Sequence, residues 1–262
     1  MEIDLKNKVA IVTGGSAGIG KSIAQGMQAC GATTIVADLT IPNEQIAGIT
    51  YHICDVASSE SVQQLSRKVL QEFGTIDILV NNAGINKPGL LVDIYEQNDN
   101  FILTEEIVDQ MIQVNQKGAF LCAQAAAKVM VQNKSGVIIN ISSECGMEGS
   151  FGQSCYAATK GALNAFTCSW AKELGSSNIR VVGIAPGINE KTSMTTPELY
   201  EAYSYIRNIP VEKIDDGYEK SIPLKRVGKL IEIGQLAVFL ASDLASYITG
   251  TTINISGGKS RG

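Results

Sequence analysis

The chain has 262 residues, of which 45% are hydrophobic and 18% charged, with a formal net charge of −5 at pH 7. This length and composition suit one soluble α/β domain with an ample buried core, and they exclude a disordered chain. The acidic balance argues against a nucleic-acid partner, because nucleic-acid binders turn basic surfaces toward the phosphates.

The amino-terminal residues Met1–Lys8 are too polar for a signal or transit peptide. No later run reaches the roughly 18 apolar residues that would span a bilayer. We therefore expect a cytoplasmic protein with no membrane partner.

Seven apolar runs alternate with helical patterns, which predicts βαβ units around a parallel sheet. The runs are nearly continuous in Val, Ile and Leu, as strands covered by helices on both faces require. The sequence therefore predicts a single doubly wound α/β domain over residues 1–262. The expected strands are Val9–Thr13, Thr33–Ala37, Tyr51–Cys54, Ile78–Asn81, Val137–Ser142, Arg180–Ala185 and Thr252–Ile255.

The first strand runs directly into the glycine-rich segment TGGSAGIG, and a helical pattern begins at Lys21. Such a turn lets backbone N–H groups and the positive end of a helix dipole approach a pyrophosphate. An ordinary glycine-rich turn is the alternative, but the position at the first strand-to-helix turn favours dinucleotide binding. The expected contacts are Gly14, Ser16, Gly18, Ile19 and Gly20.

Asp38 ends the second strand, 18 residues beyond Gly20, where a carboxylate can accept hydrogen bonds from the adenosine ribose. Its charge would repel a 2′-phosphate, and neither Ala17 nor Leu39 offers that phosphate a cation. The sequence therefore favours NAD over NADP, with a cap or turn role for Asp38 as the alternative. Asp55, after the third strand, either faces adenine or caps a helix.

The only histidine, His52, lies in a predicted strand and is expected to be a packed structural residue. Histidine triads and zinc catalysis are therefore not supported. The six cysteines include no C-x-x-C pair, so we expect reduced, half-buried thiols and no metal site.

Two long segments interrupt the alternation, one between Ile85 and Asp109 and one between Gly187 and Arg226. Long excursions at the carboxyl ends of parallel strands are where substrates are usually gripped. We expect the first to form a pocket rim or a subunit contact, and the second, about residues 187–226, to form a substrate lid.

Tyr156 and Lys160 share one face of a predicted helix. Alone, this spacing is as easily a coincidence, but Ser143 follows the fifth strand and Asn115 lies in the preceding helical pattern. Four polar groups at one sheet edge predict a proton-transfer site. A phenol titrates near 10, so we expect Lys160 and an oxidised nicotinamide to lower the pKa of Tyr156.

At these residues the sequence resembles the short-chain dehydrogenase/reductase family over essentially its whole length. The matching pieces, specific in order and spacing, are TGGSAGIG, Asp55, NNAG at 81–84, Asn115, Ser143, Tyr156 with Lys160, and Pro186-Gly187. The resemblance implies a Rossmann-type fold, an NAD(H)-dependent oxidoreductase, and a homotetramer with one interface formed by the long helices that follow Asn115 and Tyr156.

The same resemblance implies a role for each polar group. Ser143 would orient the carbonyl or hydroxyl, and Tyr156 would transfer the proton. Lys160 would also grip the nicotinamide ribose, and Asn115 would hold a water in a proton relay. Further implied cofactor contacts are Asp55, Val56, Asn82, Ala83, Gly84, Tyr156, Lys160, Pro186, Gly187 and Ile188. Thr192 lies one residue later than the usual threonine, which leaves its cofactor contact open.

A narrower resemblance, to a subgroup of the family that acts on sorbitol 6-phosphate, implies interconversion of D-sorbitol 6-phosphate and D-fructose 6-phosphate with NAD(H). The long Ile85 to Asp109 segment departs from the general family pattern but fits this subgroup. The segments that carry the resemblance are VNQKGAF, ISSECGMEGSFGQSCYAATKGALNAFTCSWAKELG, RVVGIAPGINEKT and YITGTTINISGGKSRG.

A sugar phosphate needs cations, and the candidates are Lys191, Lys225-Arg226 and the tail pair Lys259 and Arg261. A solvated surface charge is the alternative for each. We favour Lys191 and the tail pair, the latter in its own or a neighbouring subunit's site. Glu144 is expected to bind substrate hydroxyls, unless it faces water.

Two alternatives remain at this point. Another short-chain carbonyl reductase or polyol dehydrogenase, such as a 3-oxoacyl carrier-protein reductase, shares the four polar groups, and NADPH preference would support it. A nicotinamide-binding protein without turnover is the other alternative. The presence of the serine, tyrosine and lysine argues against it.

Overall fold

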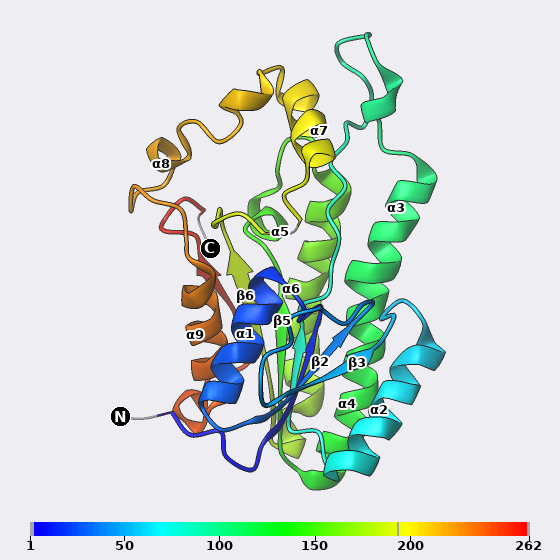
Figure 1. Cartoon of the computed structure of the whole chain (residues 1–262), viewed down its shortest axis with the longest axis vertical. Helices are drawn as coiled ribbons and strands as arrows, with labels where there is room; N and C mark the ends of the chain where they lie inside the picture. Colours follow the sequence, from blue (N-terminus) through cyan, green and yellow to red (C-terminus); the bar gives the residue numbers. More distant parts are fainter. Residues whose placement is uncertain (1–2, 193, 261–262) are drawn as a thin grey trace.

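A computed structural model of the protein describes residues 3–192 and 194–260, with Glu219 described by its backbone alone. The described residues form a seven-stranded sheet in which every neighbouring pair is parallel, in the order β3-β2-β1-β4-β5-β6-β7. Figure 1 shows the sheet with the helices around it. The strands are β1 (Val9–Thr13), β2 (Thr33–Asp38), β3 (Ile49–Ile53), β4 (Ile78–Asn81), β5 (Gly136–Ile141), β6 (Ile179–Pro186) and β7 (Thr252–Ile255). The predicted fold class is confirmed.

Strand boundaries differ from the prediction by one or two residues. β3 begins at Ile49, because Thr34 of β2 is still in register with that residue. β6 continues to Pro186, which pairs with Ile255 of β7. Backbone pairing with a neighbouring strand sets these ends, and a hydrophobic run does not record it.

The order of the strands reverses between β1 and β4. From β1 the chain moves outward to β2 and β3, then returns to β4 on the other side of β1 and continues to β7. Ligands of such sheets bind outside the carboxyl ends of the strands at this reversal. The topology therefore places the site beside the glycine-rich turn.

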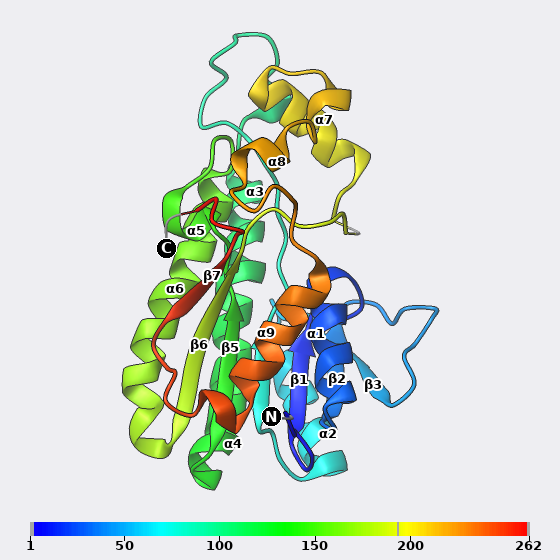
Figure 2. The same ribbon diagram turned by 90° about the vertical axis from the view of Figure 1, so that its left-hand side faces the viewer.

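Helices cover both faces of the sheet (Figure 2). Helices α1 (Gly18–Ala29) and α9 (Leu230–Ala241) lie on one face, and α2 (Ser59–Phe73), α4 (Ala119–Asn133) and α6 (Ser154–Leu174) lie on the other. Successive side chains of a strand point to opposite faces. Ala10 and Val12 accordingly pack with α1 and α9, whereas Val9 and Ile11 pack with α2 and α4.

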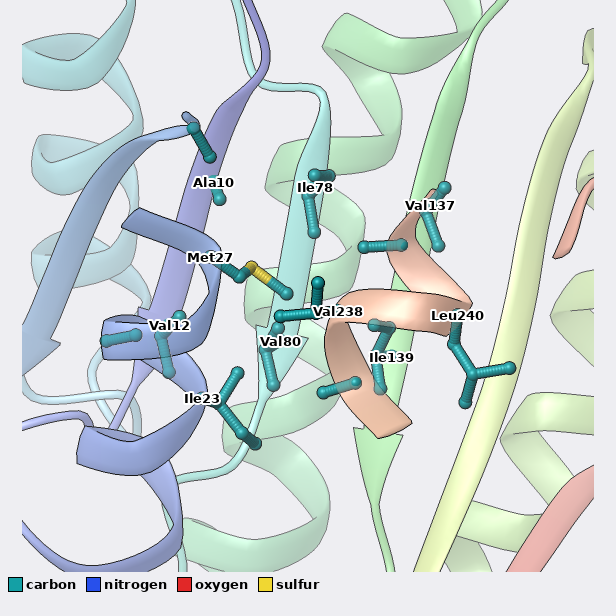
Figure 3. Close-up of a cluster of buried hydrophobic side chains, with 14 of the residues drawn as sticks. Ala10, Val12, Ile23, Met27, Ile78, Val80, Val137, Ile139, Val238 and Leu240 are labelled. Carbon is teal, nitrogen blue, oxygen red and sulfur yellow. The ribbon is translucent and has the colours of Figure 1, made fainter. Parts of the chain in front are cut away.

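Figure 3 shows the first of these layers, with side chains of α1 and α9 seated on the central strands. The labelled residues are Ile23 and Met27 of α1, Val238 and Leu240 of α9, and Ala10, Val12, Ile78, Val80, Val137 and Ile139 of β1, β4 and β5. All are buried, so the sheet that carries the site rests on a closely packed layer.

One long helical run contains a π-helical turn. α3 (Glu105–Met111), η2 (Ile112–Gly118) and α4 follow one another without a break in helical backbone, and η2 is the π-helical part. Such turns are rare and often occur at functional sites. Asn115 lies in this turn.

The two long segments pack together above the carboxyl edge of the sheet (Figure 1). Leu90 of the first segment forms a small buried cluster with Ala202 and Ile206 of α7 (Pro197–Arg207). The Tyr205 hydroxyl donates to Asp93 Oδ2 at 2.7 Å. We call residues 85–104 and 197–221 together the cap.

The remaining elements are short. They are η1 (Asp99–Phe101), α5 (Cys145–Glu148), η3 (Gly175–Ser177), η4 (Val211–Lys213), α8 (Tyr218–Ser221) and η5 (Asp243–Ala245). Each of the six cysteines is a free thiol. Within residues 3–192 and 194–260, none of the helices is long and apolar enough to cross a membrane.

Candidate active site

A cavity of about 490 Å³ opens at the carboxyl edge of the sheet, beside the reversal between β1 and β4. It connects the glycine-rich turn to the start of α6. Its lining includes these predicted cofactor and catalytic residues: Gly14, Ser16, Gly18, Ile19, Gly20, Asp38, Asp55, Val56, Asn82, Ala83, Gly84, Ser143, Tyr156, Lys160, Pro186 and Gly187.

The glycine-rich turn is shaped for close approach to a ligand. Gly14 and Gly18 have φ of 64° and 54°, which favour glycine. A Cβ on Gly20 would collide with the Gly14 carbonyl oxygen and the Asn82 amide. Ala17 offers no side-chain cap to α1, so the first N–H groups of this helix can serve an anionic ligand.

The Asn82 side chain fixes the turn from the neighbouring strand. Its Nδ2 donates to the carbonyl oxygens of Thr13 and Gly14, both at 2.9 Å. Thr13 Oγ1 in turn accepts from the N–H groups of Asn82 and Ala83. The ends of β1 and β4 are therefore locked together beneath the cavity.

Two carboxylates lie along the cavity. Asp38 Oδ2 accepts from the Ser16 N–H at 3.0 Å, and its Oδ1 accepts from the Leu39 N–H at 2.8 Å. Asp55 lines the cavity and accepts from the Ala57 N–H at 2.9 Å, whereas the cap of α2 is Ser58, so the adenine contact of Asp55 stays a prediction. Among the described lining residues, Lys160 is the one Lys or Arg.

Ser143, Tyr156 and Lys160 meet at the other end of the cavity. Ser143 follows β5, and its Oγ accepts from the Cys145 N–H at 3.2 Å. Lys160 lies one turn after Tyr156 on α6, is 4% exposed, and donates from Nζ to the Ile141 carbonyl at 2.8 Å. Its Nζ lies 5.7 Å from the centre of the Tyr156 ring.

The pKa of Tyr156 departs from the sequence prediction. Burial raises it above the usual value of a phenol, Cys145 adds to the rise, and the Ser143 hydroxyl opposes it. The expected lowering by Lys160 is therefore wrong for this structure, because the cost of burying a phenolate dominates. Burial also lowers the pKa of Lys160 to about 8.

Asn115 does not line the cavity, but its side chain joins two segments beside it by hydrogen bonds. Its Oδ1 accepts from the Ile85 N–H at 2.8 Å, and its Nδ2 donates to the Ile85 carbonyl at 2.9 Å and to Thr159 Oγ1 at 3.0 Å. A Cβ on Gly84 would lie 3.2 Å from Asn115 Oδ1 and 3.4 Å from Lys160 Nζ. The π-helical turn thus ties the chain after β4 to α6, and the water-holding role stays a prediction.

The segment after β6 differs in detail from the expectation. Pro186 and Gly187 line the cavity and Ile188 does not, whereas Asn189 does. Thr192 also lines it, and its Cβ and Cγ2 would lie 3.3 Å from a Cβ on Gly18. The later position of this threonine therefore still brings it against the glycine-rich turn.

Three of the basic residues predicted to bind a sugar phosphate have acidic partners instead. Lys259 Nζ lies 2.7 Å from Oε1 of the buried Glu144, whose Oε2 has no partner among the described atoms. Lys191 Nζ lies 2.8 Å from Asp215 Oδ2, and Arg226 pairs with Glu232. Of the described candidates, none lines the cavity. Arg261 lies outside the described residues.

Sequence reasoning missed a polar cluster beside Tyr156. The Tyr203 hydroxyl of α7 accepts from Asn86 Nδ2 at 3.0 Å and from Gln153 Nε2 at 2.8 Å. These residues are far apart in the sequence, and no motif joins them. Cavity-lining residues that sequence reasoning also missed include Val114, Ser142, Asn189 and Met194.

Histidine and metal chemistry find no support in the described residues. His52 lies on the edge strand β3, with Nε2 at 3.4 Å from Glu72 Oε2 and no place in the cavity lining. No described group of three or more His, Cys, Asp or Glu residues is placed to hold a metal ion.

Comparison with known proteins agrees with this geometry. Residues 14–260 match the family model described as enoyl-(acyl carrier protein) reductase. The chain is 49% identical to sorbitol-6-phosphate 2-dehydrogenase of Klebsiella pneumoniae, over 99% of this chain and 98% of that protein. It is 38% identical to a 3-oxoacyl-[acyl-carrier-protein] reductase of Thermotoga maritima, over 97% and 98%.

Among solved structures, the ligand-free aldohexose dehydrogenase of Thermoplasma acidophilum superposes with a TM-score of 0.84 at 29% identity. The match covers 99% of this chain and 96% of that one. The crystal structure of gox2181 gives a TM-score of 0.82 at 28% identity, over 98% and 97% of the two chains.

Proposed function

The chain belongs to the short-chain dehydrogenase/reductase family and is an oxidoreductase; we propose that it interconverts D-sorbitol 6-phosphate and D-fructose 6-phosphate with NAD(H). One observation carries the proposal. A single cavity has a dinucleotide-type turn at one end and Ser143, Tyr156 and Lys160 at the other. The substrate assignment is supported by the 49% identity to the Klebsiella enzyme along nearly the whole chain.

Ser143, Tyr156 and Lys160, at one end of the cavity, would each have a different role in proton transfer. A bound nicotinamide supplies or accepts the hydride. During ketose reduction, Tyr156 donates its hydroxyl proton to the C2 oxygen, which Ser143 holds by a hydrogen bond. The raised pKa of Tyr156 keeps this phenol protonated before the reaction. The Lys160 ammonium, protonated below about pH 8, stabilises the phenolate that results. In the oxidation direction the proton returns to Tyr156.

NAD rather than NADP is the proposed cofactor. The Asp38 carboxylate is fixed at the cavity by the Ser16 and Leu39 N–H groups. It would accept hydrogen bonds from ribose hydroxyls and repel a 2′-phosphate. Lys160, the one Lys or Arg of the described lining, is at the opposite end of the cavity. A 2′-phosphate would therefore meet an anion and no matching cation.

The proposed assembly is a homotetramer. Phe120 of α4 is 40% exposed, and the rings of Phe166 and Trp170 of α6 are stacked and partly exposed. Phe120 lies 6.5 Å from Phe166 between ring centres, so the rings form one apolar patch across two helices. Contiguous apolar patches of this kind mark protein interfaces.

One assay tests the proposed substrate and cofactor together. NADH and NADPH oxidation are recorded with D-fructose 6-phosphate, D-fructose and an acetoacetyl thioester. We expect the highest kcat/KM for D-fructose 6-phosphate with NADH. A preference for the thioester with NADPH would instead assign the chain to the 3-oxoacyl reductase activity named for its Thermotoga relative.

A further inference from the structure

The polar cluster formed by Asn86 and Tyr203 of the cap with Gln153 at the start of α6 has hydrogen-bonding capacity that the described residues do not use. The Tyr203 oxygen accepts from two side-chain amides, which occupies both of its lone pairs and leaves its single hydrogen to donate. Asn86 Oδ1 is buried and has no partner among the described atoms. Such groups are costly unless a ligand or water satisfies them. A sugar hydroxyl can, because it both donates and accepts.

This cluster lies next to the reacting groups. Gln153 is three residues before Tyr156, and its side chain is buried between Ser150 and Tyr203. Gln153 also contacts the segment that follows Ser143, because Cys145 Sγ donates to Gln153 Oε1 at 3.8 Å. Burial raises the pKa of Tyr203, which keeps its hydroxyl protonated and able to donate.

Arg207 extends the cluster by one turn of α7. Its guanidinium carbon lies 4.5 Å from the centre of the Tyr203 ring, and one of its nitrogens donates to the Tyr218 hydroxyl at 3.2 Å. The side chain is half-buried, and no described carboxylate forms an ion pair with it. Stacking on an aromatic ring holds the guanidinium plane while most of its five N–H donors stay available.

Three of the other basic residues considered for the phosphate, Lys191, Arg226 and Lys259, already form ion pairs with acids. Lys191 pairs with Asp215, and Lys259 pairs with Glu144. An ion pair must be broken before such a cation can serve a phosphate, whereas Arg207 can donate to it directly. The Arg207 guanidinium carbon lies 4.5 Å from the centre of the Tyr203 ring, so one hexose phosphate can reach both the guanidinium and the Tyr203 hydroxyl.

We propose that Arg207 binds the phosphate of the sugar substrate and that Tyr203, with Asn86 and Gln153, binds its hydroxyl groups. This assignment rests on the proposed function and makes Arg207 the residue that distinguishes a phosphorylated from a free sugar.

Arg207→Gln tests the phosphate contact. Initial rates of NAD reduction are measured with D-sorbitol 6-phosphate and with D-sorbitol, for the unsubstituted enzyme and for the variant. Loss of a charge-assisted contact should raise KM for the phosphorylated sugar at least about tenfold and leave KM for D-sorbitol unchanged. Arg207→Lys, which keeps the charge, should restore part of the loss. Inorganic phosphate should inhibit D-sorbitol oxidation competitively in the unsubstituted enzyme and not in Arg207→Gln.

Two further variants separate binding from a disturbed cap. Tyr203→Phe keeps the ring beneath Arg207 and removes the hydroxyl, so both sugars should lose affinity by the same factor. Lys213→Gln removes an exposed cation of the same cap and should leave KM for both sugars unchanged.

The outcomes distinguish the inference from the function on which it rests. If Arg207→Gln raises KM for both sugars by the same factor, or for neither, Arg207 does not bind phosphate and the inference is overturned. The sugar-phosphate activity would still stand. If the unsubstituted enzyme reduces other ketones but acts on neither sugar phosphate, the proposed function fails, and the inference fails with it.

Discussion

The charged ammonium of Lys160 lies in the protein interior, where burial disfavours the charged form. The ammonium is almost fully buried and has the Ile141 carbonyl as its hydrogen-bond partner in the structure. Burial without an opposing carboxylate explains why the pKa of Lys160 falls to about 8. The lysine is therefore poised to lose its proton at a pH where most lysines keep theirs.

Lys160→Met isolates the effect of this charge on stability. The unfolded chain titrates near the ordinary value of 10.5 and the folded protein at about 8, so between these values the unfolded chain holds the extra proton. The free energy of unfolding should therefore rise with pH across this window, by up to about 3 kcal/mol relative to the variant. Urea unfolding of both proteins without cofactor, at about pH 7.5 and about pH 10, checks it. A pH-independent difference between the two would contradict a depressed pKa.

At the residue scale, prediction from sequence succeeded in gathering Ser143, Tyr156 and Lys160, because each is tied to a strand end or a helical turn. It failed for the pKa of Tyr156, because the depth at which the fold buries this ring cannot be read from the sequence. It also could not foresee that Lys259 would pair with Glu144, because 115 residues separate the two.

The turn between β1 and α1 is the element on which cofactor binding depends. Gly20 faces the Gly14 carbonyl and the Asn82 amide so closely that no side chain fits. The Gly14 carbonyl is part of the backbone, and the Asn82 amide is fixed by two hydrogen bonds to the turn. Neither can move aside cheaply.

Gly20→Ala should therefore destabilise the protein by about 1 to 3 kcal/mol, the usual cost of overpacking, and weaken NADH binding. Gly175→Ala is the matched control, because its Cβ would meet nothing within 4 Å and its φ of −59° suits alanine. Urea midpoints and NADH fluorescence titrations measure both effects. Equal stability of the two variants would show that the turn tolerates a side chain.

At the element scale, the strands and the glycine-rich turn could be predicted because each has a local signature. The π-helical turn at Asn115 and the packing of residues 85–104 against α7 could not. The first depends on hydrogen bonds to Ile85, and the second on contacts such as Leu90 with Ala202 and Ile206. Both are tertiary contacts that hydrophobic periodicity does not encode.

For the whole molecule, the aromatic patch on α4 and α6 leads to a prediction about assembly. A tetramer of the 27.8 kDa chain has a mass of about 111 kDa, four times the monomer. Light scattering coupled to size exclusion should give that mass, and Phe120→Lys should lower it by placing charge in the patch. A monomer mass for the unsubstituted chain would remove the patch as an interface.

The proposed chemistry depends most on Tyr156, which would deliver a proton to the oxygen of the carbon that exchanges hydride. Tyr156→Phe removes that proton and keeps the ring, with Tyr247→Phe, a fully exposed phenol, as the matched control. Both variants should bind NADH by fluorescence like the unsubstituted enzyme.

The decisive measurement is kcat for D-fructose 6-phosphate reduction by Tyr156→Phe. Because general acid catalysis is lost, we expect kcat to fall at least about 100-fold in Tyr156→Phe. We expect no change in kcat for Tyr247→Phe. Turnover by Tyr156→Phe at the unsubstituted rate, with NADH still bound, would contradict the assignment of Tyr156 as the proton donor.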